Sequence, residues 1–433
     1  MNHNRIAAAT IIGTAIEWYD FFLYAAAAGL VFNHTFFATD DPTVATLLAF
    51  LSVGLSFLFR PLGAFLAGHF GDRIGRRAVL RITLMGMGIA TTLIGLLPSF
   101  ATIGIAAPLI LIFLRIIQGV SAGGEWGGAV LMAVEHAPAG RRGLFGAFPQ
   151  IGVPLGLLMS SGVLAIMALI APGDAFIEWG WRIPFLLSFV LIFIGHFIRH
   201  GVDESPVFTE ISERKRMTNN PLGKMLRHNW VVVLLAALIF AGNGAAGYMT
   251  TGGFIQNYAT GTLGMERSYV LFAVSASAAF WLVFTLMAGI VSDYIGRRNT
   301  YILGFLMQMG GIWLLFPLVD SGRLFIALAI LTIGLGFTYG QQSAFYAELF
   351  PASVRFSGVS VTYALGAILG GAFSPMIAAY LVKTTGSTQA VTYYLMTMAL
   401  IGLVAALLFK NRNDIQLGIG AEQEQRESAL HGL

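Results

Sequence analysis

A ten-residue motif occurs twice in this chain. The segment at residues 68–77, GHFGDRIGRR, returns at residues 289–298 as GIVSDYIGRR, with two glycines, one aspartate and both arginines at matching positions. Each matching pair is separated by 221 residues, about half of the 433-residue chain. Because a repeat at one fixed offset indicates duplicated structural units, the chain is predicted to fold as two related halves.

A second duplicated pattern supports this division. Glu135, Pro138 and Arg142 correspond to Glu348, Pro351 and Arg355, with a common offset of 213 residues. The offset is shorter because the first half carries extra residues between its two patterns. In each half, the ten-residue motif therefore comes first and the Glu-Pro-Arg pattern follows it.

Composition places both halves in a membrane. Of all residues 57% are hydrophobic and only 11% are charged, whereas a soluble domain has about 25% charged residues. The apolar residues form blocks of roughly 20 residues, the length of a helix that crosses a bilayer. Twelve blocks can be distinguished, at approximately residues 6–32, 43–69, 78–98, 104–134, 143–170, 182–200, 229–258, 268–292, 300–319, 323–349, 356–383 and 389–409.

The longest hydrophilic stretch, residues 201–228, follows six blocks and precedes six. We therefore predict an all-α polytopic membrane protein with twelve transmembrane helices in two pseudo-symmetric six-helix bundles. The predicted parts are an N-terminal bundle at residues 1–200, a cytoplasmic linker at 201–228, a C-terminal bundle at 229–410 and a short cytoplasmic tail at 411–433.

The lysine and arginine residues between the blocks predict the orientation. With both termini in the cytoplasm, nineteen of these residues lie on the cytoplasmic side and four on the other. Cytoplasmic loops of membrane proteins carry this excess of positive charge. The net charge of +4 is thus explained by topology, and nucleic-acid binding is not expected.

The motifs carry a family resemblance. The doubled loop resembles the signature of the major facilitator superfamily, whose members contain parallel six-helix repeats. Six further segments together resemble its metabolite:proton symporter family: EWYDF at 17–21, FRPLG at 59–63, RIIQG at 115–119, GGEWGG at 123–128, WGWRIPF at 179–185 and ESP at 204–206. The resemblance implies a protein of the bacterial inner membrane that imports a metabolite with protons. That family imports citrate, 2-oxoglutarate, shikimate, aromatic acids, proline and betaine, and the chain looks most similar to its shikimate-type branch.

Five ionisable residues lie inside the apolar blocks, where charge is costly and usually functional. They are Glu17, Asp20, Arg60, Arg115 and Glu125. Three carboxylates and two arginines sum to −1, and one bound proton makes the cluster neutral, which a low-dielectric site favours. We therefore predict proton coupling by Glu17, Asp20, Glu125 and Arg115, with Asp20 or Glu17 as proton carrier and Glu125 paired to an arginine. The alternative is a static ion-pair network that locks the helices together.

A substrate carboxylate requires a cationic partner. Guanidinium groups bind carboxylates through two parallel hydrogen bonds, so Arg60 and Arg115 are candidates unless the neighbouring acids occupy them. The predicted substrate-binding set is Arg60, Arg115, Tyr24, Gln118, Gln150, Asn243, Tyr248, Gln342 and Tyr363. Some of these polar groups are expected only to hold helices together.

The doubled loops are predicted to form a cytoplasmic gate. Their aspartates can accept hydrogen bonds from the N-terminus of a neighbouring helix, and their arginines can reach acids of the second duplicated pattern. The predicted gate residues are Asp72, Arg76, Arg77, Glu135, Arg142, Asp293, Arg297, Arg298, Glu348 and Arg355. Such contacts would hold the halves together while the transport cavity faces outward. The alternative is a loop that only anchors the topology.

Glycines recur at positions 119, 123 and 127, beside Gly124 and Gly128. Small residues at this spacing allow another helix to approach the backbone closely. The sequence therefore predicts tight helix packing next to Glu125.

Other activities lack support in the sequence. The chain has no cysteine and no GxxxxGK[ST] nucleotide loop, and His196 and His200 lack a third metal ligand. GNGAAG at 242–247 lies inside an apolar block with no preceding strand. We predict a monomeric transporter of a small-molecule substrate and protons in the lipid bilayer, without cofactor, metal or enzymatic activity.

Two other transport modes stay open as alternatives. The segment GVPLG at residues 152–156 departs from the GPxxGG pattern expected of a drug:proton antiporter. The tail after Lys410 lacks the heptads of the osmosensing relatives, so import of a zwitterionic osmolyte such as proline or betaine is less favoured than import of an organic acid.

Overall fold

The computed structural model describes residues 3–74, 76–200, 221–251 and 253–431, and the side chains at 68–80, 199, 221–222 and 249–251 lie outside the description. Within these residues the regular elements are helices, apart from one isolated antiparallel bridge between Phe409 and Leu430. The all-α architecture predicted from the apolar blocks is thereby confirmed.

The first half contains α1 (His3–Ala27), η1 (Ala28–Phe32), α2 (Asn33–Thr35), α3 (Pro42–Ile74), α4 (Arg76–Leu96), α5 (Phe100–Ile103), α6 (Ala106–Ala122), α7 (Glu125–Glu135), α8 (Arg142–Ile170), η2 (Phe176–Gly180) and α9 (Arg182–Arg199). The second half contains α11 (Pro221–Thr251), α12 (Phe254–Asn257), η3 (Tyr258–Thr262), α13 (Arg267–Ile295), α14 (Arg297–Asp320), α15 (Leu324–Phe337), α16 (Gln342–Leu349), α17 (Arg355–Gly366), η4 (Ala367–Gly371), α18 (Ser374–Thr385) and α19 (Gln389–Leu407). Short helices η5 (Ile419–Ala421) and α20 (Glu422–Gln425) follow.

Eleven helical stretches of the described chain are long and apolar enough to cross a membrane. The third of the twelve predicted blocks corresponds to α4, whose described apolar part, Arg81–Leu96, is shorter. Several blocks are interrupted in the structure: α6 and α7 are separated at Gly123 and Gly124, α15 and α16 at residues 338–341, and η4 and α18 at residues 372–373. The first two breaks make Glu125 and Gln342 the first residues of new helices.

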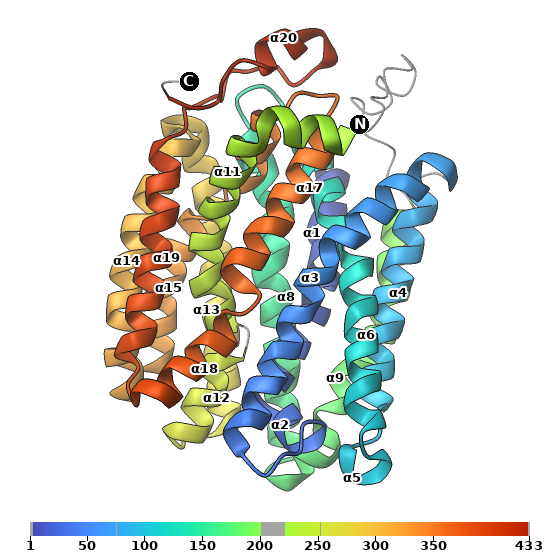
Figure 1. Ribbon diagram of the computed structural model, residues 1–433, viewed down its shortest axis with the longest axis vertical. Coiled ribbons are helices and arrows are strands. Elements are labelled where there is room, and N and C mark those ends of the chain that lie inside the picture. The colour runs from blue at the N-terminus through green and yellow to red at the C-terminus, as the bar shows by residue number, and fades with distance from the viewer. Residues whose placement is uncertain (1–2, 75, 201–220, 252, 432–433) are drawn as a thin grey trace.

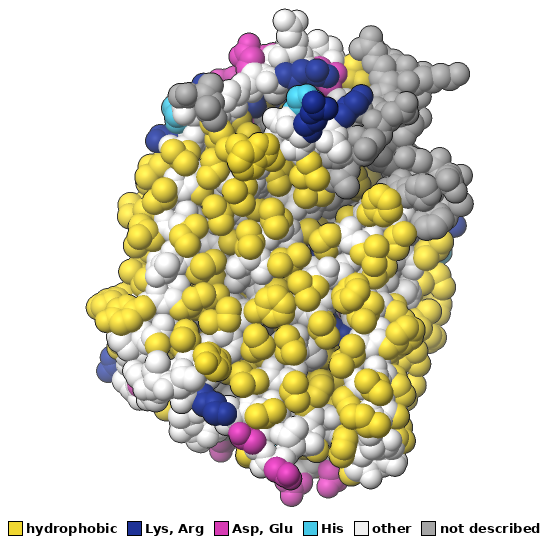
Figure 2. Space-filling model, in the orientation of Figure 1, with side chains coloured by type: hydrophobic (Ala, Val, Ile, Leu, Met, Phe, Trp, Pro, Cys, Tyr) yellow, Lys and Arg dark blue, Asp and Glu magenta, His cyan; other side chains and the backbone are white. Residues whose placement is uncertain are grey.

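The helices run roughly along the long axis of the molecule (Figure 1). Both termini lie at one end, which we call the terminal end, whereas α2, α5 and α12 lie at the opposite end. Hydrophobic side chains cover the middle of the face in Figure 2, and charged side chains gather at its two ends. An apolar band between polar ends is the surface that a lipid bilayer requires.

Glycines bring α3 and α6 into backbone contact. A Cβ atom on Gly119 or Gly123 would overlap the carbonyl oxygen of Ser56 or Arg60, respectively. This confirms the predicted tight packing. Gly128 is different, because a Cβ there would meet no atom within 4 Å.

Candidate transport site

Arg60 on α3 is a buried cation. Its side chain is only 3% exposed, and its guanidinium carbon lies 5.0 Å from the ring centroid of Trp18 and 4.8 Å from that of Phe57. Nε of Arg60 has no hydrogen-bond partner, and the side chain forms no ion pair within the described part of the chain. A buried charge without a counter-ion is costly, so this position suits an anionic ligand.

Arg115 on α6 is used differently. Its Nε and Nη2 donate to the carbonyl oxygens of Ser52 and Val53 at 3.0 and 2.9 Å, and Nη1 donates to Gln118 at 2.9 Å. Its guanidinium also stacks 3.9 Å above the ring of Tyr24. Arg115 therefore fastens α6 to α3, and these three contacts use N–H groups that the sequence analysis made available to a substrate carboxylate.

The three buried acids of the first half share one cavity of about 10 Å³, room for roughly one water molecule. Asp20 Oδ1 accepts a hydrogen bond from Ser188 Oγ at 2.6 Å. The cavity is lined by Glu17, Asp20, Glu125, Ser188, Ile16, Leu84, Met87, Gly88 and Ile192. Helices α1, α4, α7 and α9 thus gather the predicted proton-coupling acids inside the first half.

The predicted pairing of acids with Arg60 or Arg115 is not met among the described residues. Neither arginine forms an ion pair there. Arg115 donates to two backbone carbonyls and to the Gln118 side chain, whereas Arg60 lies beside the rings of Trp18, Phe21 and Phe57. A static ion-pair network including these two arginines is therefore absent from the described structure.

Four predicted substrate residues are engaged in bonds between helices. Gln150 accepts from Trp126 Nε1 and donates to the Tyr339 carbonyl, both at 3.1 Å. Asn243 donates to Thr338 at 2.7 Å and to Leu335 O at 3.2 Å. Tyr24 donates to Ser52, and Gln118 donates to Thr91. These contacts fit the structural alternative, in which the polar groups hold the bundle together.

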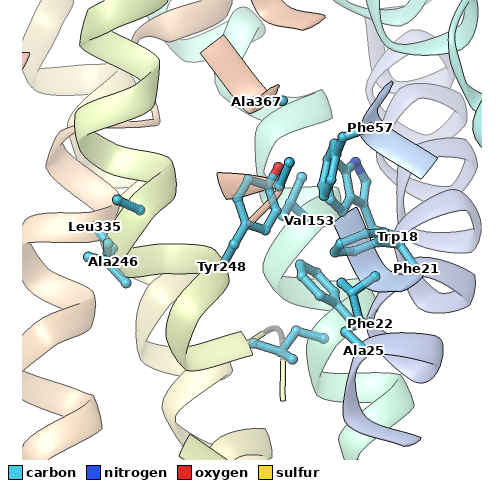
Figure 3. Packing of buried hydrophobic residues seen from close by; sticks show 14 of the residues in the cluster. Trp18, Phe21, Phe22, Ala25, Phe57, Val153, Ala246, Tyr248, Leu335 and Ala367 are labelled. Carbon is cyan, nitrogen blue, oxygen red and sulfur yellow. The ribbon is translucent and has the colours of Figure 1, made fainter. Parts of the chain in front are cut away.

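Aromatic rings from both halves meet beside Arg60. Tyr248 of α11 reaches toward Trp18, Phe21 and Phe57 (Figure 3), and its ring centroid lies 5.9 Å from Trp18 and 5.1 Å from Phe57. Tyr248 also interacts electrostatically with Arg60. This side chain therefore connects the second half to the Arg60 position.

A second aromatic contact joins the halves. Tyr363 of α17 stacks on Trp126 of α7 with centroids 3.7 Å apart, and Phe240 stacks on the other side of Tyr363 at 4.6 Å. The sequence analysis did not include Trp18 and Trp126 among the candidate site residues, because aromatic residues in apolar blocks usually face lipid or the protein core. Each directly follows a predicted acid, Glu17 or Glu125, and this position could have indicated them.

The second half presents buried polar atoms without hydrogen-bond partners. The hydroxyl groups of Tyr339 and Tyr363 lie near each other but lack a partner with good geometry. Within the described part of the chain, neither amide atom of Gln342 has a hydrogen-bond partner, nor has the hydroxyl of Ser343 or Ser360. Tyr339, Ser343 and Ser360 were not in the predicted substrate set. Such groups are nearly always paired in folded proteins, so they suit a polar ligand.

The second copy of the duplicated loop contacts the first half at the terminal end. Asp293 accepts hydrogen bonds from the backbone N–H groups of Gly143 and Leu144 at 2.7 and 3.0 Å. These are the first N–H groups of α8, where the helix dipole favours a negative charge. Arg297 pairs with Asp293 at 2.8 Å and with Glu348 at 3.0 Å.

Two ion pairs cross between the halves beside this loop. Arg142 lies 3.6 Å from Glu348, and Arg355 lies 3.3 Å from Glu135. Arg298 donates to the carbonyl of Leu407 and forms no ion pair with an acid among the described residues. The side chains of Asp72, Arg76 and Arg77, in the first copy of the loop, lie outside the described residues.

The C-terminal tail contacts the predicted gate residues Arg142 and Arg355, a contact that the sequence did not indicate. Arg142 donates to the carbonyl of Ile415, and Arg355 donates to that of Leu417 at 2.9 Å. The side chain of Gln425 accepts from Ala352 N at 2.8 Å and donates to two tail carbonyls at 2.7 Å. The tail therefore binds both arginines that cross between the halves.

The opposite end is also closed. Asn257 Nδ2 donates to Gly29 O at 3.0 Å, and a Cβ on Gly29 would overlap the Gly253 carbonyl. Lys383 lies 3.6 Å from Asp41, whose pKa is lowered by the Thr43 backbone N–H and by Lys383. The two halves therefore contact each other at both ends of the molecule.

Two family models cover most of the chain. One, described as "Sugar (and other) transporter", matches residues 6–233, and the other, "Major Facilitator Superfamily", matches residues 244–431. The chain belongs to the major facilitator superfamily. It is a membrane transporter, and the predicted family is confirmed.

Relatives of this transporter span its whole length. It is 40% identical over 415 residues to the "Inner membrane metabolite transport protein YhjE" of Escherichia coli (strain K12), covering 94% of each chain. It is 37% identical over 417 residues to the "Shikimate transporter" of the same organism, again covering 94% of each. Identity to the "Proline/betaine transporter" of Salmonella typhimurium is 31% over 414 residues, covering 93% of this chain and 82% of the other.

The fold of this transporter matches a solved member of the superfamily. The structure of the proton:xylose symporter XylE bound to 6-bromo-6-deoxy-D-glucose superposes with a TM-score of 0.75. The match covers 94% of both chains at 17% sequence identity. The predicted major facilitator fold is therefore confirmed.

Proposed function

We propose that this transporter imports a small hydroxylated organic acid, such as a shikimate-like carboxylate, together with protons. The observation that carries the proposal is the buried guanidinium of Arg60, which has no ion pair within the described chain. A carboxylate would supply the missing counter-charge and two parallel hydrogen bonds.

The second half supports a hydroxylated substrate. Among the described residues, Tyr339, Tyr363, Gln342 and Ser360 carry buried polar atoms that form no hydrogen bond of good geometry. A buried unpaired polar group costs about 1–3 kcal/mol, which a substrate hydroxyl can recover. The acid group would therefore face the first half and the hydroxyl groups the second.

The aromatic rings support an alternative substrate. Rings can bind a quaternary ammonium group, and one relative is named a proline/betaine transporter. Betaine offers a carboxylate to Arg60 but no hydroxyl or N–H group to Tyr339, Gln342 and Tyr363. A hydroxylated acid could form hydrogen bonds with more of these polar groups than betaine could, and we favour it as the substrate for that reason. A drug:proton antiporter, with a cationic or apolar cargo, would leave Arg60 unpaired.

The acids of the first half support proton coupling. Glu17, Asp20 and Glu125 surround a cavity that can hold about one water molecule. A carboxyl group at membrane depth that exchanges a proton is a recurring element of proton-driven transporters. We infer that Asp20 or Glu17 takes up the proton, and that protonation makes the loaded site electrically neutral.

We infer that the bundles at residues 1–200 and 229–410 rock against each other around Arg60. The excess of lysine and arginine supports an orientation with the terminal end in the cytoplasm of a bacterial inner membrane. The pairs Arg142–Glu348 and Arg355–Glu135 would then close the cytoplasmic side and separate when the cavity opens inward.

Uptake by purified protein in liposomes tests this function. The substrate panel contains shikimate, quinate, citrate, proline and betaine, each with and without an inward proton gradient. We expect uptake of a hydroxylated acid that the gradient accelerates. Gradient-driven uptake of betaine or proline with no uptake of any acid would overturn the proposal in favour of the osmolyte.

A further inference from the structure

The relationship between the two halves extends from the predicted gate into the interior of the bundle. Trp126 on α7 and Gln150 on α8 correspond to Tyr339 and Tyr363, at the same offset of 213 residues as the Glu-Pro-Arg pattern. Each of the four side chains is at most 3% exposed. We call these four residues the inner quartet.

Two contacts of the inner quartet cross between the halves. The ring of Trp126 stacks on that of Tyr363, with centroids 3.7 Å apart and planes 13° apart. Gln150 Nε2 donates to the Tyr339 carbonyl at 3.1 Å. The relationship between the halves exchanges Trp126 with Tyr339 and Gln150 with Tyr363, so the two contacts occupy equivalent places. The first half therefore contacts both tyrosines.

The chemistry of the quartet differs between the halves. In the first half, Gln150 Oε1 accepts from Trp126 Nε1 at 3.1 Å. An indole N–H only donates and a backbone carbonyl only accepts, so the two partners fix the orientation of the Gln150 amide. In the second half, the hydroxyl groups of Tyr339 and Tyr363 form no hydrogen bond of good geometry among the described residues. The tyrosine hydroxyl groups are therefore the part of the quartet that suits a polar ligand.

The first half holds both tyrosines in place. The ring of Tyr363 lies between Trp126 and Phe240, whose centroid is 4.6 Å away with planes 15° apart. The Tyr339 carbonyl accepts from the backbone N–H of Gln342 at 3.0 Å as well as from Gln150, so Gln150 binds where α16 begins. Groups that are fixed before a ligand arrives lower the entropy cost of binding it.

A series of aromatic contacts connects the quartet to Arg60. The ring centroid of Phe240 lies 6.4 Å from that of Tyr248. Tyr248 in turn lies 5.1 Å from Phe57 (Figure 3), and the guanidinium carbon of Arg60 lies 4.8 Å from the Phe57 centroid. Arg60 and the tyrosine pair thus belong to one buried cluster to which both halves contribute.

We propose that Trp126 and Gln150 are positioning residues, which hold Tyr363 and Tyr339 so that both tyrosine hydroxyl groups bind hydroxyl groups of the substrate. This inference rests on the import of a hydroxylated acid proposed above and assigns the selection of hydroxylated over plain carboxylic acids to the quartet. Because both positioning contacts cross between the halves, the tyrosines are held only while the halves meet at this level.

Binding of two related acids to the purified full-length protein tests the selection. Shikimate and cyclohex-1-ene-1-carboxylate share the ring and the carboxylate, but only shikimate carries hydroxyl groups. We expect the wild type to bind shikimate about tenfold more tightly by calorimetry, because additional hydrogen bonds form. Tyr363→Phe and Gln150→Met should each reduce this ratio about fivefold and leave the affinity for the plain acid nearly unchanged. An unchanged ratio in both variants would overturn the proposal.

Trp126→Leu, which loses both the stacking and the N–H group, should reduce the ratio likewise and serves if Gln150→Met does not fold. Trp181→Phe is the matched control. Trp181 is buried in the same half, and its Nε1 donates to the Ile177 carbonyl at 3.0 Å, outside the quartet. We expect it to keep the wild-type ratio. An equal loss of affinity for both acids in Gln150→Met and Trp126→Leu would indicate a merely structural role and would overturn the proposal.

Fluorine NMR of the substrate-free protein, labelled with 3-fluorotyrosine, tests the positioning without a ligand. Tyr339→Phe and Tyr363→Phe identify the two resonances by removing them. We expect Trp126→Leu to shift the Tyr363 resonance, because the ring current of the stacked indole is lost, and Gln150→Met to shift that of Tyr339. Unshifted resonances would overturn the positioning role.

The two experiments separate the two proposals. If the wild type binds neither acid, the substrate proposal fails, and the fluorine spectra still decide whether Trp126 and Gln150 hold the tyrosines. Equal affinity of the wild type for both acids would overturn selection by Tyr339 and Tyr363.

Discussion

Arg355 of the second half pairs with Glu135 of the first at 3.3 Å. The equivalent residues of the duplicated pattern pair in the reverse direction, because Arg142 of the first half lies 3.6 Å from Glu348 of the second. Each half thus supplies one arginine and one acid to the other. This reciprocity follows from two related bundles that face each other about a pseudo-two-fold axis along the membrane normal.

Arg355→Gln should weaken the closed terminal end. Breaking a buried ion pair costs about 3–5 kcal/mol because a charge is left unpaired. The chain has no cysteine, so spin labels can be placed at Ala139→Cys and Asn299→Cys without a background. We expect a longer inter-label distance in Arg355→Gln. The exposed Arg323 at the opposite end provides the control Arg323→Gln, and equal distances in both variants would contradict the gate.

Arg60→Gln should lose affinity for organic acids by about thirtyfold or more, because a charge-assisted hydrogen-bond pair is removed. Arg60→Lys should recover only part of the affinity, since an ammonium group lacks the planar fork. Binding is measured by thermal shift of the purified variants. Arg426→Gln, in the exposed part of the tail, should bind like the wild type. Wild-type affinity in Arg60→Gln would place the acid group elsewhere.

Asp20→Asn and Glu17→Gln separate the two candidate proton carriers. The amide mimics the protonated carboxyl group, so the variant of the true carrier should exchange substrate across the membrane but no longer accumulate it along a proton gradient. Counterflow and gradient-driven uptake measure the two activities. Glu178→Gln, at an exposed position, should retain both. Full proton coupling in both Asp20→Asn and Glu17→Gln would refute the assignment.

Gln425→Leu should loosen the tail from the gate. The buried side chain of Gln425 makes three hydrogen bonds. Its loss removes the acceptor of the Ala352 N–H and the donor to the Gln416 and Gly418 carbonyl groups, of which, among the described residues, only Gly418 O keeps a further bond, from the Ala421 N–H. Faster proteolytic cleavage of the tail is the expected result. Gln423 is exposed two residues earlier, so Gln423→Leu should be cleaved at the wild-type rate. A resistant Gln425→Leu variant would show that the tail is held by other contacts.

Gly123→Ala should destabilise the first half, because the new Cβ would overlap the carbonyl oxygen of Arg60. Overpacking of this kind costs about 1–3 kcal/mol and should lower the thermal unfolding temperature in detergent. Gly128→Ala is the control, since its Cβ meets no atom within 4 Å and alanine favours the helix. Equal unfolding temperatures of the two variants would contradict the close contact of α3 and α6.

The sequence alone predicted three features: the duplicated patterns, the apolar blocks and the charged residues inside these blocks. Each of them depends only on residue type and spacing. They predicted the helical membrane fold and the superfamily, which are confirmed. They also placed Glu135, Arg142, Glu348 and Arg355 in one gate, whose function stays a proposal.

Only the tertiary structure distinguished Arg60 from Arg115. Both are arginines in apolar blocks, yet Arg115 is satisfied by carbonyl groups of α3 and Arg60 has no ion pair in the described chain. The sequence also did not predict the stacking of Trp126 on Tyr363 or the contact of the tail with the predicted gate residues. A helix forms from local backbone hydrogen bonds, so the spacing of residues in the sequence is enough to predict it. The partner of a buried side chain depends on the distance and the rotation between helices that are far apart in the sequence. Only the packing of the whole molecule determines these two quantities.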